Sequence, residues 1–322
     1  MVLIVSEQLD ASTNHVINWL LKFKTNIIRV NKYDLKIESI NYSKNEILFK
    51  YNDELFLSTK KITSFWYRRG HIGFDYNLDL ESKNSDLQDL IFYHLNAEWE
   101  ELIRFFTNNL EINSEIKSIG NYRVKDKKLD QLFLAKNAGL NIPKTLITTQ
   151  KEDLLHFFKQ CNKKVITKGI SKSPSLTFKN QSLEGYTEEI TEALIDSLPD
   201  TFFPGFFQEN IIKQYELRIF FLKNSFYSMA IFSQNDEQTK TDVRKYNDAK
   251  PNRTVPYILP KTVEDKLLRL MNNLNLDTGS IDMIVDKNDE FYFLEVNPNG
   301  QFGMVSTPCN YYIEKHIAEI LA

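Results

Sequence analysis

The sequence predicts a protein of mixed α/β and α+β class, in which an α/β domain comes first. The first 30 residues alternate strand, helix and strand, an order typical of an open, mostly parallel sheet. Beyond residue 200, short apolar strands and polar turns outnumber helices. With 322 residues, the chain is long enough for two or three domains, each with its own core.

The expected first domain covers residues 1–115. Val2–Val5 and Asn26–Val30 are apolar enough for buried strands, and Ser12 or Thr13 can begin the helix between them. The rest of this domain is expected to contain short strands within 36–57, a buried strand at Ile62–Tyr67 and a long amphipathic helix from Ser85.

The expected second domain covers residues 116–200. A helix at Leu129–Ala138 ends at Gly139, since glycine favours the left-handed conformation that terminates helices. The further elements are a strand at Thr145–Thr148, a helix after the capping sequence Thr149–Glu152, a strand at Lys164–Lys168 and a weak hairpin within 169–185.

The expected third domain, residues 201–322, is rich in strands. They are expected at Phe206–Ile211, Glu216–Leu222, Ser225–Phe232, Ser280–Val285 and Phe291–Val296. Thr262 is expected to cap one helix, and Thr307 and Pro308 are expected to open the last one, because proline suits the first helical position.

Composition excludes several classes of protein. The net charge of −3 argues against a nucleic-acid-binding surface. Cys161 and Cys309 cannot build a disulfide framework, which favours a reduced, cytoplasmic setting. No apolar run approaches the length of a membrane span, so we expect no membrane partner.

Two strands near the C-terminus carry acidic residues where a buried strand would be apolar. Glu295 and Asn297 are two residues apart and share one face of their strand. Asp282 joins them if the two strands pair. Two carboxylates and an amide oxygen suit Mg²⁺, which commonly holds the phosphates of a nucleotide. This pattern indicates an enzyme that uses ATP.

The usual glycine-rich phosphate loops are absent from the sequence. Charged side chains must therefore hold the phosphates, and three separated segments supply them. In chain order, these segments and the metal residues are Lys128 before Gly139, Lys168 at a strand end, the E-x-x-I-x-x-x-E sequence from Glu209 to Glu216, Asp282, and Glu295-x-Asn297. Over residues 115–322, their order and spacing resemble the ATP-grasp fold, in which ATP lies between two α+β units.

The resemblance implies a role for each of these residues. They are Lys128 and Lys168 for the phosphates, Glu209 and the backbone near Ile212 for adenine, Glu216 for the ribose, and Asp282, Glu295 and Asn297 for Mg²⁺. Lys127 or Lys125 could replace Lys128, and isolated acids on strands are commonly solvated.

A narrower resemblance covers the whole chain and includes the N-terminal domain, which would be a pre-ATP-grasp domain. Its motifs are Trp66–Arg69, Glu216–Arg218, Thr241–Tyr246 and Glu295–Phe302. They resemble the peptide-maturing ATP-grasp ligases, which include microviridin ligases and grasp-with-spasm maturases. The resemblance implies a graspetide synthetase that joins Asp or Glu side chains of a ribosomal precursor to Thr or Ser hydroxyls, or to Lys amines. Related enzymes are often homodimers.

Two arginines are expected to act in catalysis. Transfer of the γ-phosphoryl group requires charge neutralisation, and the planar guanidinium groups of Arg218 and Arg244 suit phosphate contact. The same groups could stabilise the oxyanion formed later. Asp242 or an oxygen of the product phosphate could serve as the base.

Other functions remain open at this point. One is an ATP-grasp ligase that adds free amino acids to a carboxylate, and another is a non-catalytic module that binds nucleotide or peptide. We expect the leader of a precursor to dock at the region 171–189 or the helix that follows it, where an exposed edge and acidic residues could hold an extended basic peptide. These acidic residues are Glu184, Glu188, Glu189 and Glu192.

Overall fold

The structure is a computed structural model that describes residues 1–52, 54–74, 85–122, 127–171, 175–178, 181–184, 187–233 and 252–322. The chain forms two compact units. Unit 1 contains Met1–Val124, Gln301–Ser306 and Tyr312–Ala322, and unit 2 contains Lys125–Gly300 and Thr307–Tyr311. The three-domain division expected from the sequence stays a prediction. Among the described residues, no helix combines the length and the apolar character that a membrane crossing requires.

Unit 1 is built around a four-stranded parallel sheet, as the β-α-β opening predicts. The order is β2 (Ile27–Val30), β1 (Val2–Val5), β6 (Ser64–Tyr67) and β7 (Lys117–Ile119). All four residues of β1 are buried because strands on both sides and apolar side chains around them exclude water. The carboxyl ends of β1, β2 and β6 therefore lie along one edge, where open α/β sheets commonly bind ligands.

Helices and a second sheet complete unit 1. They are α1 (Ala11–Lys22), α2 (Ser85–Ile112), α8 (Ile313–Leu321), the short helix η1 (Thr59–Lys61), and the antiparallel sheet β3 (Leu35–Asn41), β4 (Glu46–Tyr51) and β5 (Leu55–Ser58). Asp10, rather than Ser12 or Thr13, caps α1, since its carboxylate accepts from the Thr13 backbone N–H at 3.1 Å. Ser12 and Thr13 are inside the helix.

The first part of unit 2 is a small antiparallel sheet with helices on one face. Its strands, in order, are β12 (Glu188–Glu189), β9 (Val165–Thr167), β13 (Thr201–Glu209) and β8 (Thr145–Gln150). The helices are α4 (Lys151–Gln160) and α5 (Glu192–Ser197), and a hairpin is formed by β10 (Ser175–Phe178) and β11 (Gln181–Glu184). Phe207 packs with Phe157 in the core under α4. Because side chains alternate along a strand, Phe206 projects to the opposite face.

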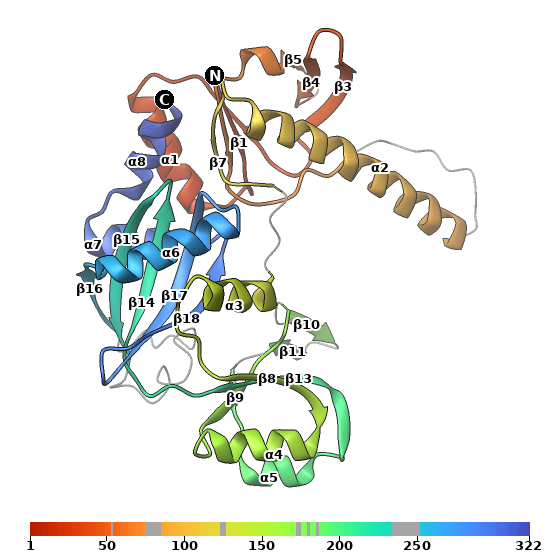
Figure 1. Ribbon diagram of the computed structural model, residues 1–322. Helices are drawn as coiled ribbons and strands as arrows, with labels where there is room; N and C mark the ends of the chain where they lie inside the picture. Colours follow the sequence, from red (N-terminus) through yellow and green to blue (C-terminus); the bar gives the residue numbers. More distant parts are fainter. Residues whose placement is uncertain are drawn as a thin grey trace. The chain divides into compact units, whose positions relative to one another are not determined.

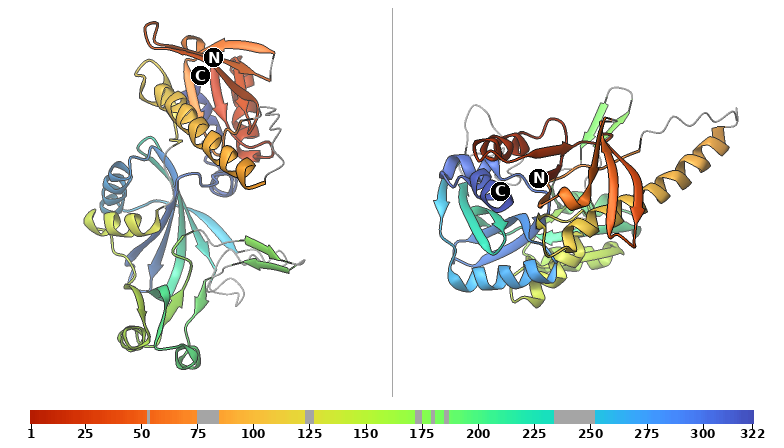
Figure 2. Two further views of the ribbon diagram at one scale, coloured as in Figure 1. Left: turned by 90° about the vertical axis from the view of Figure 1, so that its right-hand side faces the viewer. Right: turned by 90° about the horizontal axis from the view of Figure 1, so that it is seen from above.

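The second part of unit 2 is a five-stranded antiparallel sheet. Its order is β16 (Arg253–Tyr257), β15 (Ser225–Phe232), β14 (Lys213–Leu222), β17 (Thr278–Asp286) and β18 (Phe291–Asn297). The helices α3 (Lys128–Asn137) and α6 (Lys261–Asn273) lie together on one face of this sheet (Figures 1 and 2). The other face is left for the charged side chains of β14, β17 and β18.

Two helix starts differ from the sequence prediction. Pro260 precedes α6, so Thr262 is inside that helix rather than at its cap. Pro308 is near the end of α7 (Gly303–Cys309), and the last helix begins after Tyr312. The Ser306 hydroxyl accepts from the Ile313 backbone N–H at 2.9 Å, and this contact supplies the polar cap of α8 from earlier in the chain.

A buried glutamine fixes α3 to the edge strand of the five-stranded sheet. The Gln131 amide nitrogen donates to the Val296 carbonyl at 2.7 Å, and its amide oxygen accepts from the Val296 N–H at 2.9 Å. Gln131 is only 2 % exposed. Its side chain thus satisfies both backbone groups of an edge-strand residue that has no further strand beside it.

We predict that Gln131→Leu lowers the free energy of unfolding by about 2–4 kcal/mol, because both Val296 backbone groups would stay buried and unpaired. Denaturation in urea measures this change. Gln160→Leu, on the exposed end of α4, is the control and should stay within about 0.5 kcal/mol of wild type. Equal stability of the two variants would contradict the role assigned to Gln131.

Candidate functional site

The register of three neighbouring strands places charged side chains in one row. Arg218 of β14 lies opposite Asp282 of β17, and Asp282 lies opposite Glu295 of β18. Asn297 lies opposite Ser280, two residues further along β18. The pairing of the two acidic strands, on which the predicted metal site depends, is therefore confirmed. Directly opposed residues share a face, so these side chains converge on the same side of the sheet.

Asp282 and Arg218 form an ion pair in the middle of this row. The Arg218 Nη1 atom donates to both carboxylate oxygens of Asp282. Burial raises the pKa of Asp282 to about 6; the Arg218 guanidinium opposes this shift, while the negative charges of Glu295 and Glu216 add to it. The carboxylates of the row thus carry more negative charge than Arg218 neutralises. A divalent cation would relieve this repulsion.

The donor atoms in this row fit Mg²⁺. Glu295 and Asn297 present a carboxylate and an amide beside Asp282, and the Asn297 amide oxygen accepts from the Asn299 N–H at 3.1 Å, which orients the side chain. Within the described parts of the chain, no group of three or more His, Cys, Asp or Glu side chains is arranged for a metal ion. A third protein ligand at this position would therefore be an amide. Arg218 is a competitor for the Asp282 oxygens.

Glu216, the residue expected at the ribose, belongs to a small polar cluster on β14. Its carboxylate accepts from the Lys213 ammonium and, at 3.0 Å, from the Ser233 hydroxyl. Lys213 is 8 % exposed and was not among the predicted site residues. Its place inside the E-x-x-I-x-x-x-E sequence, three residues before Glu216, is the signal that could have identified it.

The residues expected at adenine lie where β13 ends. Glu209 is the last residue of β13, and its carboxylate lies 3.8 Å from the Lys144 ammonium. The Glu209 N–H also donates to the Lys144 carbonyl at 2.9 Å. Ile212 follows after β13 and is half exposed, which leaves its surroundings open to a ligand.

The two lysines expected at the phosphates are brought together. Lys128 is the first residue of α3, and Lys168 directly follows β9. The Lys128 ammonium donates to the Gly169 carbonyl at 2.7 Å, so the start of α3 is tied to the end of β9. Both ammonium groups lie over the Phe206 ring, at 6.0 Å and 5.6 Å from its centroid. The assignment of these lysines to phosphate stays a prediction.

Two of the expected catalytic residues lie outside the described residues. They are Asp242 and Arg244, in the stretch 234–251. Their roles therefore stay predictions. The structure describes the surroundings of the third expected catalytic residue, Arg218. Its Nε atom is buried and has no hydrogen-bond partner among the described residues.

Arg68, from the motif Trp66–Arg69, is buried in unit 1 and forms an ion pair there. It is 5 % exposed and its Nε atom lies 3.3 Å from the Asp10 carboxylate. Burial lowers the pKa of Arg68, and the Asp10 charge opposes that shift. A buried pair of this kind ties the end of β6 to the start of α1, since removal of either partner would leave an uncompensated charge.

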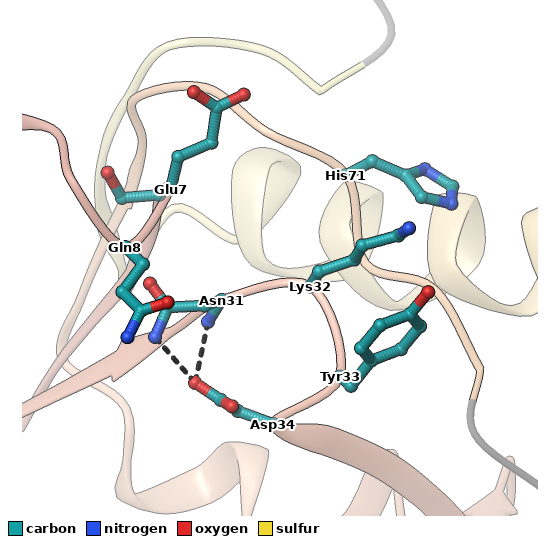
Figure 3. Close-up of a pocket in the computed structure, with 8 residues that line it drawn as sticks. Glu7, Gln8, Asn31, Lys32, Tyr33, Asp34 and His71 are labelled. Carbon is teal, nitrogen blue, oxygen red and sulfur yellow. Dashed lines mark hydrogen bonds between the residues drawn. The ribbon is translucent and has the colours of Figure 1, made fainter.

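Unit 1 also has a cavity of about 380 Å³ that sequence reasoning did not identify (Figure 3). It lies at the carboxyl ends of the parallel strands, and its lining consists of Ser6, Glu7, Gln8, Asn31, Lys32, Tyr33, Asp34 and His71. The Asp34 carboxylate accepts from the Asn31 backbone N–H at 2.9 Å and from its side-chain amide at 2.7 Å. None of the predicted site residues lines this cavity.

The chain was compared with family models, curated protein sequences and solved structures. No family model and no curated protein sequence matches the chain. Solved structures do match. The macrocyclase MdnC of Microcystis aeruginosa MRC, bound with precursor peptide MdnA, is 28 % identical with a TM-score of 0.77, and the match covers 99 % of this chain and 98 % of that one.

Two further solved structures extend the comparison. The RiPP-associated ATP-grasp ligase of Chryseobacterium gregarium, in complex with ADP and a leader and core peptide, is 26 % identical with a TM-score of 0.78, covering 99 % of this chain and 94 % of that one. D-alanine–D-alanine ligase of Bacillus anthracis, complexed with ATP, shares only the fold, at 13 % identity and a TM-score of 0.51, covering 99 % and 95 % of the two chains. The chain has an ATP-grasp fold and resembles, over its full length, the ATP-grasp ligases and macrocyclases that mature ribosomal peptides.

Proposed function

We propose that this chain is an ADP-forming ligase that activates Asp or Glu side chains of a ribosomal precursor peptide and joins them to hydroxyls or amines of the same peptide. The observation that carries the proposal is the row of Arg218, Asp282 and Glu295 across three paired strands of an ATP-grasp fold. The full-length likeness to a macrocyclase bound with its precursor peptide, and to a ligase bound with ADP and peptide, supports it further.

In this proposal, ATP and Mg²⁺ are held in unit 2. The ligands are Lys128 and Lys168 for the phosphates, Glu209 and the backbone of Ile212 for adenine, Glu216 for the ribose, and Asp282, Glu295 and Asn297 for the metal. Bound Mg²⁺ would neutralise charge on the phosphates. Arg218 lies beside the proposed metal ligands and pairs with Asp282. Its guanidinium could move from that carboxylate to the phosphoryl group when ATP is bound.

The reaction follows from the chemistry of carboxylates. A carboxylate is a poor acyl donor because its leaving group would be oxide, whereas an acyl phosphate loses phosphate. The γ-phosphoryl group of ATP is therefore transferred to a side chain of the peptide, and ADP is the product. A Thr or Ser hydroxyl then attacks to give an ester, or a Lys amine attacks to give an amide, and phosphate leaves. The nucleophile loses one proton, to Asp242 or to a phosphate oxygen.

Arg218 has two tasks in this sequence. Together with Arg244, it would bind the transferred phosphoryl group, because guanidinium groups pair with phosphate oxygens through two N–H donors. It would then stabilise the oxyanion of the tetrahedral intermediate.

The partner in this proposal is a precursor peptide with a leader and a core, rather than a nucleic acid or a membrane. A homodimer and a cytoplasmic location belong to the same proposal. The leader would dock near β12, where Glu188 and Glu189 are exposed and the Glu189 carboxylate accepts from the Asn210 amide at 3.1 Å. An extended basic peptide could add to this edge of the sheet.

The test is ADP release by the purified chain in the presence of a candidate precursor, sought as a short reading frame beside its gene that encodes Asp or Glu together with Thr, Ser or Lys, with mass spectrometry of that peptide. We expect release that depends on the peptide and the loss of one water for each bond formed. Incorporation of a free amino acid without loss of water from the peptide would support the alternative ligase. Nucleotide binding without any ADP release would support a non-catalytic module.

Loss of one metal ligand should separate chemistry from folding. We predict that Glu295→Gln lowers peptide-dependent ADP release by about a hundredfold or more. The amide would hold Mg²⁺ less tightly than the carboxylate, so the metal would no longer offset the charge on the phosphates in the transition state. Asp265→Asn on α6, where the carboxylate is half exposed, is the control and should release ADP at the wild-type rate. Wild-type activity of Glu295→Gln would contradict the metal assignment.

Binding of a divalent cation should depend on pH through Asp282. Its carboxyl has a pKa of about 6, raised from 3.8, so the free protein gains a proton there as the pH falls through 6. A proton and a cation compete for the same oxygens, and affinity should drop by about tenfold per pH unit below that value. Electron paramagnetic resonance of Mn²⁺ binding between pH 5 and 7.5 measures this. A flat profile would contradict the prediction, and Asp282→Asn should remove the dependence.

A further inference from the structure

The aromatic ring of Phe206 lies beneath both lysines that the proposed function assigns to phosphate. The Lys128 ammonium is 6.0 Å and the Lys168 ammonium 5.6 Å from the ring centroid. Phe206 is 1 % exposed and lies in β13, which pairs with β8 on one side and β9 on the other. The ring is therefore held rigidly, whereas the two lysine side chains above it are half-buried.

The position of Phe206 differs from that of its neighbour Phe207. Phe207 packs under α4, where Phe202 contacts it edge-on at 6.1 Å. Phe206 projects to the other face of the sheet, as does Gln208 two residues later. Gln208 is paired with Ile166 of β9, and Lys168 lies two residues after Ile166, so Lys168 is on the same face as Phe206. Phe207 therefore packs in the core under α4, whereas Phe206 contacts Lys128 and Lys168 on the opposite face.

Two ammonium groups close to one ring repel each other when no anion is bound. The face of an aromatic ring carries negative potential and attracts both cations, and the Gly169 carbonyl adds a hydrogen bond to Lys128. These contacts hold two flexible side chains in place before a ligand arrives. Preorganised charges bind an anion more tightly because less side-chain freedom is lost on binding.

We propose that Phe206 is a positioning residue that holds Lys128 and Lys168 together for the phosphates of the nucleotide. This inference rests on the proposed function, since it takes ATP as the ligand. Phe206 itself does not touch the phosphates in this account. It acts through the two ammonium groups, and its contribution should appear with a phosphorylated ligand and be absent with one that lacks phosphate.

The test changes the electrostatics of the ring and leaves its size nearly unchanged. Pentafluorophenylalanine incorporated at position 206 reverses the sign of the potential on the ring face. We expect the dissociation constant of ATP to rise by about five- to thirtyfold, from the loss of two cation–π contacts. The dissociation constant of adenosine should stay within about twofold of wild type, because adenosine has no phosphate for the lysines. Calorimetric titration of the full-length chain measures both ligands.

Conventional substitutions provide a second line of evidence. Phe206→Leu removes the ring and should weaken ATP binding to a similar degree, whereas Phe206→Tyr keeps the ring and should retain most of the affinity. Phe207→Leu is the matched control, since it creates a comparable cavity in the same strand but on the face under α4. It should lower stability and leave both ligand affinities unchanged.

The possible results separate this inference from the function on which it rests. Unchanged ATP affinity in the pentafluorophenylalanine protein, with wild type binding ATP more tightly than adenosine, would overturn the role of Phe206 alone. Equal weakening of ATP and adenosine would also overturn it, because the effect would then be a general loss of structure. A wild-type chain that binds ATP no better than adenosine would overturn both the inference and the proposed nucleotide function.

Discussion

The pairing of β14, β17 and β18 is the constraint on which the candidate site depends. It places Arg218, Asp282 and Glu295 side by side on one face of a sheet. Like charges directly opposite each other destabilise a sheet, and the raised pKa of Asp282 reflects both burial and the neighbouring acids. Strands that accept this cost are typical of functional sites, where local rules are broken together.

Helix α3 connects two parts of the site that are far apart in the sequence. Lys128 begins the helix and bonds to Gly169 at the end of β9, while Gln131, three residues later, bonds to both backbone groups of Val296. Val296 lies between Glu295 and Asn297. Residues three apart lie on the same side of a helix. One short face of α3 therefore sets the position of a proposed phosphate ligand and of the strand that carries two proposed metal ligands.

Unit 1 is fixed around the carboxyl ends of its parallel strands. Arg68 pairs with Asp10 there, and its guanidinium lies over the Phe302 ring at 5.9 Å. The Ser12 hydroxyl donates to the Gln301 side chain at 2.6 Å. Gln301 and Phe302 follow directly after Gly300, three residues beyond Asn297, the last residue of β18. The motif Glu295–Phe302 thus begins in β18 of unit 2 and ends in unit 1, where Phe302 is buried.

The sequence by itself determined the α/β and α+β class, most strands, and the ATP-grasp resemblance, because alternation of apolar residues and the order of charged motifs are local properties of the chain. It also identified Asp282, Glu295 and Asn297 as a group, since residues two apart on a strand share a face. It misplaced the caps of α1 and α6, which are Asp10 and Pro260 rather than the hydroxyl residues two or three positions later.

Only the tertiary structure decided which distant residues meet. The bonds of Gln131 to Val296 and the ring of Phe206 beneath Lys128 and Lys168 depend on strand register and on how α3 lies on its sheet. A glutamine in a helix or a phenylalanine in a strand has no distinctive sequence pattern. Its partner is fixed by packing over long separations along the chain, which local periodicity does not encode.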